Sequence, residues 1–254
     1  LRHFCVSAQA MQHMPASDNV ADLMSSGLTQ LPTDTQRVLR LAACIGSEFD
    51  LATLTSVCGM SRAATARALW PALLDGLLLP LSGAYRTATD EDSTVVRYRF
   101  AHDRIQQAAY ALLREEERAP THHAIGLQLH SQLSQEEREE RLFEIVTHLN
   151  KGAQERQDAA SREALAELNL QAAQRAMAAA AFASAWELLQ TALKLRGPER
   201  FTRNYQAAIL LNSAAAEGAA YAGDLTAMEA LVAEVEREGR SLLDKARARE
   251  VMMR

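Results

Sequence analysis

The stretch RYRFAHDRIQQAAYALL, residues 97–113, changes its periodicity at a His-Asp pair. Tyr98 and Phe100 alternate with arginines, which is the pattern of a half-buried strand. After Asp103 the apolar residues follow helical spacing, at Ile105, Ala108, Ala109 and Leu112. The stretch therefore predicts a strand that leads directly into a helix, with His102 at the junction.

Helix and strand signals precede this junction in a recognisable order. The sequence predicts helices over 31–46, 51–59 and 61–76, and then strand-like runs over 77–87 and 93–100. Pro32, Ser61 and the glycines at the ends supply the start and stop signals. Three helices, a β-hairpin and a further helix are the parts of a winged-helix domain, with the hairpin as its wing. We assign this domain to residues 31–116.

From Glu115 onward the sequence predicts only helices, and we assign residues 117–254 to helical hairpins. The breaks between helices are expected at Pro120, at the QEEREE run, at Gly152, and at the RGPE and AGD segments. From about residue 162 small residues recur on neighbouring helices, at Ala172, Ala173 and Ala176 and then at Ala185, Leu189 and Ala192, with a second pair suggested by Ala227 and Leu231. This spacing is typical of a tetratricopeptide-like repeat with a degenerate period. The predicted fold class is mainly α.

Composition limits the classes of function. The chain of 254 residues is 48% hydrophobic but only 5% aromatic, as expected of a mostly helical soluble protein. A net charge of −5 gives no general reason to expect nucleic acid or an anionic membrane surface, and the apolar runs are too short to cross a bilayer. The three cysteines, Cys5, Cys44 and Cys58, have no metal or redox spacing, so we expect buried thiols in a reducing cytoplasm.

Catalytic and metal-binding patterns are missing from the sequence. There is no glycine-rich phosphate loop and no pair of carboxylates in an apolar context. His122, His123 and His130 fall on one predicted helix, but adjacent histidines point to different sides of it and no cysteine or carboxylate completes a metal site. We therefore expect no catalytic residue, no metal and no cofactor held by this chain alone, and no enzymatic activity.

Charge also argues against DNA binding by the predicted winged helix. Between Leu31 and Arg114 nine arginines stand against eight acidic residues. The expected recognition helix carries only Arg62 and Arg67 beside Trp70, whereas phosphate contacts need a concentrated basic face. A DNA-binding transcriptional regulator with a helical sensor array is kept as the alternative function, and a pure scaffold as a third.

The His-Asp pair allows two interpretations. Asp103 is predicted to be the N-cap, with Gln106 three residues on completing a capping box, so that the pair simply builds the start of the helix. The free N–H groups of a helix start beside an imidazole are, however, also a natural site for a phosphate.

Several segments resemble a known class of protein. NVADLM, LPTDTQRVLRLAACIGSEFDLATL, LLDGLLLPL and YRFAHDRIQQAAYALL resemble the region after the nucleotide-binding module in large bacterial signalling ATPases, the signal-transduction (STAND) class of AAA+-like ATPases. FAHDRIQQAAY, HHAIGLQLH and FEIVTHLN resemble more narrowly the proteins that join this ATPase to a Ser/Thr kinase-like domain and a sensor histidine kinase. The resemblance runs from about residue 18 to about residue 195.

The resemblance implies a role for the junction. In that class a winged-helix domain supplies the histidine of a hydrophobic-His-Asp motif to the phosphate of ADP, and Ala101-His102-Asp103 is similar to this motif. It departs from the motif by placing alanine before the histidine, with the large apolar residue Phe100 one position earlier. The implied cofactors, ADP or ATP with Mg²⁺, belong to the parent protein.

The implied function is that of a regulatory and protein-interaction segment. Its partners would be the upstream ATPase module of the same chain, which the winged helix restrains, and a protein that the helical repeats sense. Residues 1–30 would be the tail of that module or a linker. Because the chain starts at Leu1 without a methionine, we expect it to be a piece of a longer protein.

Overall fold

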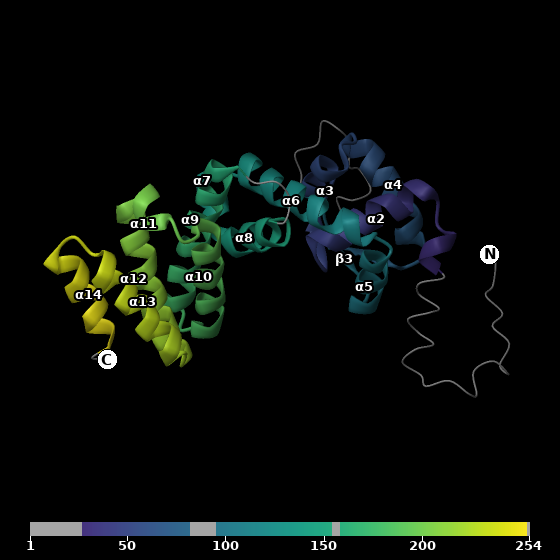
Figure 1. Ribbon diagram of the computed structural model, residues 1–254. Coiled ribbons are helices and arrows are strands. Elements are labelled where there is room, and N and C mark those ends of the chain that lie inside the picture. The colour runs from purple at the N-terminus through teal and green to yellow at the C-terminus, as the bar shows by residue number, and fades with distance from the viewer. Residues whose placement is uncertain (1–26, 82–94, 154–157, 253–254) are drawn as a thin grey trace, which may run out of the picture. The chain divides into compact units, whose positions relative to one another are not determined.

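The computed structural model describes residues 27–81, 95–153 and 158–252 and is mainly helical, as predicted (Figure 1). The chain divides into two compact units, residues 1–129 and 130–254. Most of the predicted tail, residues 1–26, lies outside the described residues. Among the described helices, none combines the length and the apolar run that a bilayer crossing needs.

The first unit begins with the helices that the sequence predicts. They are α2 (Thr33–Ile45), α3 (Leu51–Cys58) and α4 (Arg62–Leu74). Asp50 caps α3, because its side chain accepts a hydrogen bond of 2.7 Å from the backbone N–H of Thr53. Ser61 caps α4 in the same way through Ala64 at 3.2 Å. Ser61 is therefore the cap that the sequence predicts, whereas Asp50 is not predicted and α2 follows Pro32 without a side-chain cap.

A three-stranded antiparallel sheet accompanies these helices. Its strands are β1 (Glu48–Asp50), β2 (Leu78–Pro80) and β3 (Arg97–Phe100), in the order β1-β3-β2. The sequence predicts β2 and β3 but misses β1, because three residues are too few to show a period and become a strand only by pairing with β3. Residues 82–94, which hold the predicted connection 88–92 and the adjoining ends of both predicted strands, lie outside the described residues.

The core of the first unit forms where the sheet meets the helices. On β3 the side chains of Tyr98 and Phe100 are buried while Arg97 and Arg99 are exposed, which confirms the predicted alternation. The ring of Phe49 on β1 lies 5.8 Å from the rings of both aromatic residues. Apolar residues of α2, α3 and α4 complete the core, including Val38, Leu39, Leu51, Leu54 and Leu69. The unit continues into α5 (Asp103–Ala111) and α6 (Glu115–Gln132).

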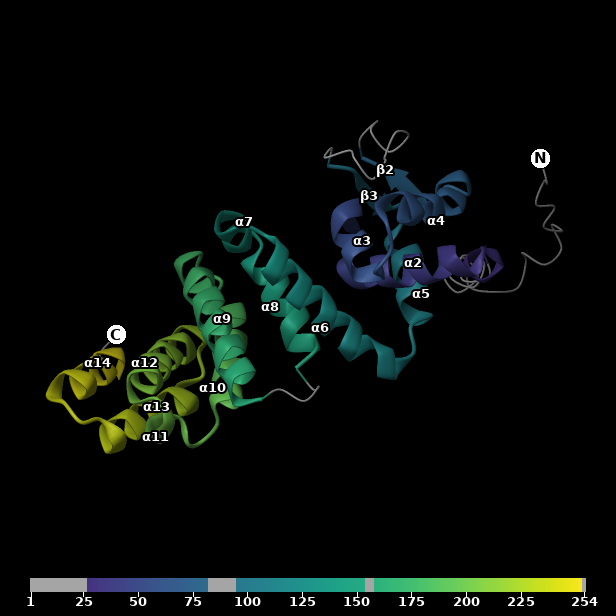
Figure 2. The same cartoon turned by 90° about the horizontal axis from the view of Figure 1, so that it is seen from above.

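The second unit consists of helices throughout its described part (Figure 2). They are α7 (Gln135–Glu140), α8 (Leu142–Lys151), α9 (Ala159–Ala178), α10 (Phe182–Arg196), α11 (Arg200–Arg203), α12 (Tyr205–Ala222), α13 (Leu225–Glu238) and α14 (Leu242–Met252). Two predicted breaks are wrong. Pro120 lies inside α6, near its exposed first turn, where water can satisfy the carbonyl that proline leaves without a partner. The QEEREE run forms α7 itself, started by a capping box at Ser134.

Helices α9 and α10 form a hairpin that α12 and α13 repeat 43 positions later. The buried alanines Ala172, Ala173 and Ala176 of α9 correspond to Ala215, Ala216 and Ala219 of α12. Buried Asn169 likewise corresponds to buried Asn212. On the second helix of each hairpin, Ala185, Leu189 and Ala192 correspond to Met228, Val232 and Val235. The sequence-based match of Ala185 with Ala227 is thus one residue short, because the buried side chain at that level of α13 is Met228.

The turn between α9 and α10 holds an alanine in a left-handed conformation. Ala180 has φ 56°, while Gly223 occupies the corresponding turn between α12 and α13 with φ 83°. The backbone N–H groups of Ala180 and Ala181 bond back to the carbonyls of Met177 and Ala176, which fixes this conformation. A Cβ atom makes it costly, since alanine pays about 1–2 kcal/mol for left-handed backbone.

We therefore expect Ala180→Gly to raise the free energy of unfolding of the second unit by about 0.5–1 kcal/mol. Glycine removes the strain of the left-handed backbone, but it also increases the conformational entropy of the unfolded chain, which offsets part of this gain. Gly223→Ala is the matched control and should lower it by about 1 kcal/mol, since a Cβ there meets open space and only the backbone resists. Urea denaturation of both variants measures the two changes. A destabilised Ala180→Gly variant would show that the turn is not held as described.

Candidate functional site

The predicted site histidine lies at the start of α5, on the surface. His102 occupies the N-cap position with an extended backbone, φ −152° and ψ 144°, and its side chain is exposed and makes no capping bond. It has no side-chain partner among the residues that the structure describes. Phe100 fills the core two residues earlier, and the backbone N–H of Ala101 bonds to the carbonyl of Leu77 at 3.0 Å. The imidazole is thus presented outward from a fixed backbone.

The predicted capping box at this junction is wrong. Asp103 is the first residue of α5 rather than its N-cap, and its side chain is exposed. Gln106 does not reach back to the start of the helix, because its amide nitrogen donates to the carbonyl of Ala43 on α2 at 3.1 Å. Asp103 still lies in the first turn, where the interaction of a carboxylate with the helix dipole stabilises the helix by about 0.3–1 kcal/mol. Gln106 instead ties α5 to α2.

Charges around the start of α5 are balanced. Arg97 and Arg99 project from the exposed face of β3, and their register partners on β1 are Asp50 and Glu48. Opposite charges facing each other across a ladder offset one another. The start of α5 is therefore not embedded in a strongly positive field, and His102 stands out for its exposure rather than for its surroundings.

The exposed stripe of α4 is poorly suited to DNA. Arg67 is exposed on it, together with Trp70 at 45% and Leu74 at 71% of their surface. Arg62, the other basic residue predicted on this helix, is partly buried. One exposed cation among apolar groups does not make the basic face that phosphate contacts need. The placement of these residues does not favour the alternative function in DNA binding.

The three histidines of α6 are not brought together as a metal site. His122 is buried and its Nε2 lies 3.1 Å from the hydroxyl of Tyr110 on α5. His123 is partly buried, and His130 lies near the end of the helix in the second unit. Over the described ranges, no group of three or more His, Cys, Asp or Glu residues could hold a metal ion.

The cysteines that the structure describes are buried thiols. Cys44 and Cys58 are both buried and free, as the sequence predicts, whereas Cys5 lies outside the described residues. Burial raises the pKa of the Cys58 thiol to about 11, against the opposing charge of Arg37. At neutral pH this thiol stays protonated, which makes it a poor nucleophile.

Buried polar contacts fix the helices of the second unit. Arg196, with only 3% of its side chain exposed, donates to the carbonyl of Ala207 at 2.7 Å and pairs with Glu163 at 2.8 Å. Another cluster joins α11, α12 and α13, and consists of Arg200, Asn212 and Glu234. These contacts cross between helices that are apart in sequence, so they set how the hairpins pack and which side chains they present.

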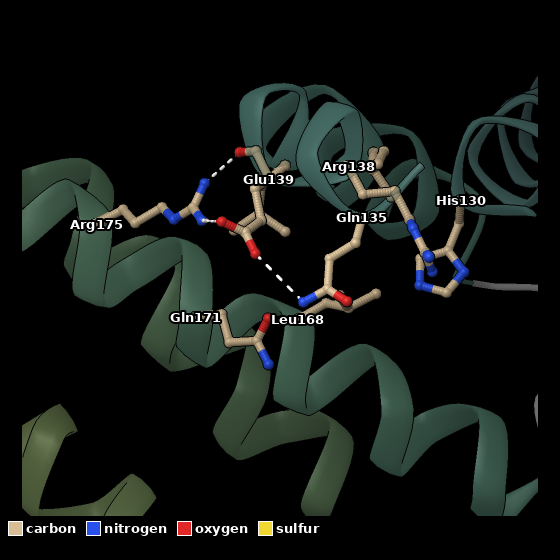
Figure 3. A pocket seen from close by; sticks show the side chains of 9 residues that line it. His130, Gln135, Arg138, Glu139, Leu168, Gln171 and Arg175 are labelled. Atoms are coloured by element: carbon tan, nitrogen blue, oxygen red, sulfur yellow. Dashed lines mark hydrogen bonds and ion pairs between the residues drawn. The ribbon is translucent and has the colours of Figure 1, made fainter. Parts of the chain in front are cut away.

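A pocket lies beside α7 within the second unit (Figure 3). It encloses about 170 Å³ and is lined by residues of the end of α6 and of α7, α8 and α9: His130, Gln135, Arg138, Glu139, Leu142, Ile145, Leu168, Gln171 and Arg175. We call it the α7–α9 pocket. Its volume is below the ~300–1,000 Å³ of pockets for drug-sized ligands and cofactors.

This pocket is not predicted from the sequence. From the sequence, the QEEREE run is expected to be a break between helices, and His130 is considered only as a metal ligand. A weak signal exists, because residues 135, 138, 139 and 142 follow helical spacing, as do residues 168, 171 and 175. Nothing in the sequence shows that these two faces meet.

Comparisons with known proteins give one informative match. No protein-family model matches the chain, and no solved structure matches it. The chain is 28% identical over 233 residues to the hybrid signal transduction histidine kinase G of Dictyostelium discoideum. The match covers 76% of this chain but only 7% of that protein's length.

The match supports the coarser part of the resemblance, a relation to signal-transduction kinases. It carries neither the ATPase class nor the winged-helix assignment, and the kinase activity in its name is that of the Dictyostelium protein.

Proposed function

We propose that this chain is the regulatory and protein-interaction segment of a multidomain signalling protein and supplies no catalytic group of its own. Residues 31–116 form a winged-helix domain that restrains a nucleotide-binding module elsewhere in the same protein. The hairpins that follow are tetratricopeptide-like and bind a protein partner that releases the restraint. The similarity to a signal transduction histidine kinase supports the signalling part of this proposal.

The winged-helix assignment rests on the order and pairing of the elements. A helix, a short strand, two helices, two strands and a helix follow one another from α2 to α5. The last strand, β3, lies between the other two and pairs antiparallel with both. The hairpin of β2 and β3 is then the wing, and α4 takes the position of the recognition helix.

The observation that carries the nucleotide contact is the exposure of His102. Its imidazole is engaged by no residue that the structure describes, yet its backbone is fixed between a strand of the core and a helix. A buried or hydrogen-bonded histidine would be explained by the fold alone. An outward histidine at a helix start is suited to a phosphate oxygen of ADP held by the partner module, which would also hold Mg²⁺.

Nucleotide binding tests the proposal directly. We expect residues 1–254 alone to bind neither ATP nor ADP at micromolar concentrations, because one histidine without a phosphate loop cannot hold a nucleotide. The full-length parent should retain ADP. Calorimetric titration of both proteins measures this difference. Micromolar binding by residues 1–254 alone would overturn the division of roles.

A further inference from the structure

The α7–α9 pocket has an apolar floor and a polar rim. Leu142 and Ile145 are buried in the second unit, and Leu168 is partly buried beside them. The rim carries charged and amide side chains from α7 and α9 together with His130. An apolar floor beneath charged groups keeps water from screening them fully, so electrostatic attraction there exceeds that on open surface.

One end of the rim is already satisfied internally. Arg175 donates to the backbone carbonyl of Glu139 and pairs with its carboxylate at 3.3 Å. The amide nitrogen of Gln135 also approaches this carboxylate, at 3.5 Å. Figure 3 shows these contacts as dashed lines meeting at Glu139. The only carboxylate among the lining residues is thus neutralised.

The other polar side chains of the rim have hydrogen-bond donors without an acceptor among the described residues. Arg138 uses only its Nε, in a long bond of 3.4 Å to the carbonyl of Ser134, and its two terminal nitrogens have no partner in the described part of the chain. The side chains of His130 and Gln171 likewise have no described partner. In Figure 3 no dashed line reaches any of these three side chains. Counting Arg138, Arg175 and Glu139, the pocket carries one net positive charge.

We propose that the α7–α9 pocket binds the carboxylate side chain of an acidic segment of a protein partner. The terminal nitrogens of Arg138 match a carboxylate in a two-point contact, and the amide of Gln171 and the ring of His130 add donors. The leucine and isoleucine floor takes the methylenes of a glutamate. At about 30 Å³ for each water of the liquid, a volume of 170 Å³ has room for one such side chain.

This proposal rests on the protein-binding part of the proposed function and gives the partner a chemical class. It does not depend on His102 or on ADP, since all of its residues lie in the second unit. Binding of a small probe to residues 1–254 can therefore fail while the nucleotide contact holds, and the reverse.

The test uses acetyl-glutamate-amide as the probe and acetyl-glutamine-amide as its uncharged equivalent. We expect the glutamate probe to shift the NMR signals of the Gln171 side-chain amide and the His130 ring in a saturable way, and the glutamine probe to leave them unchanged. Arg138→Gln should weaken binding about tenfold or more, the loss expected for a charge-assisted hydrogen bond. Arg162→Gln, which removes an exposed arginine elsewhere on α9, should have no effect.

Three results would overturn the proposal. They are equal shifts with both probes, unchanged binding in Arg138→Gln, and binding of inorganic phosphate without binding of the glutamate probe. Gln171→Ala gives a second, independent variant, because its side chain is exposed and its loss does not threaten the fold. It should weaken the glutamate probe without altering the circular dichroism of the protein.

Discussion

In the full-length parent protein, His102→Ala is expected to speed ADP release by about 10- to 100-fold. A hydrogen bond between a histidine and a charged phosphate contributes about 1.5–3 kcal/mol, and each 1.4 kcal/mol is a factor of ten. Loss of this contact should also depopulate the restrained state, so that basal output rises without a signal. Release of a fluorescent ADP analogue from the purified parent measures the rate.

The same substitution should leave the fold intact. The side chain of His102 is exposed and makes no capping bond. The substitution His102→Ala in residues 1–254 should therefore change the free energy of unfolding by less than about 0.5 kcal/mol. Gln107→Ala, an exposed position of α5, is the control and should change neither stability nor ADP release. If His102→Ala unfolds the first unit and leaves ADP release unchanged, His102 is a structural residue and the nucleotide contact is wrong.

At the junction of residues 97–113, the periodicity of the sequence predicts the strand and the helix but not the contacts of the helix start. The alternation around Tyr98 and the helical spacing after Asp103 predict β3 and α5 correctly, because a buried face imposes its period on the sequence. The same spacing cannot settle the cap. Gln106 has its best acceptor in the carbonyl of Ala43, which is 63 positions away and visible only in the folded unit.

Elements without a period were the ones missed. β1 has three residues and exists through its pairing with β3. The break expected at Pro120 does not occur because this proline lies near the exposed first turn of α6, where it costs little. The α7–α9 pocket depends on two helix faces separated in sequence by the whole of α8. For β1 and for the pocket the deciding contact is tertiary, and local propensity does not contain it.

The two hairpins share a second sequence signal besides their small residues, a recurring asparagine. The five alanines and Leu189 that carry the small-residue pattern of α9 and α10 are predicted as contact residues, and all six are buried. The asparagine at the same level was not singled out, although Asn169 and Asn212 recur 43 positions apart and both are fully buried. A buried amide survives in a core only when its hydrogen bonds are made, so its recurrence indicates a specific partner at each site.

For this reason Asn169→Ala is expected to destabilise the second unit by about 2–4 kcal/mol. Asn169 and Asn150 of α8 exchange two amide hydrogen bonds of 2.8 and 2.9 Å, and Asn169 also donates to the carbonyl of Leu165 at 2.8 Å. Each lost bond costs about 0.5–1.5 kcal/mol, and the unfilled space adds to this. Gln174→Ala, at an exposed position of the same helix, should change stability by less than about 0.5 kcal/mol.

The measurement must follow the second unit separately, since two units need not unfold together. A Trp70→Phe background leaves Trp186 as the only tryptophan, and Trp186 packs against the core of the hairpins. Its fluorescence in urea then reports that unit. Asn150→Ala combined with Asn169→Ala should cost less than the sum of the two single changes, because both remove the same pair of hydrogen bonds. Strictly additive costs would mean that α8 is not held to α9 by this pair, and that α8 and the pocket residues it carries dock by apolar contacts alone.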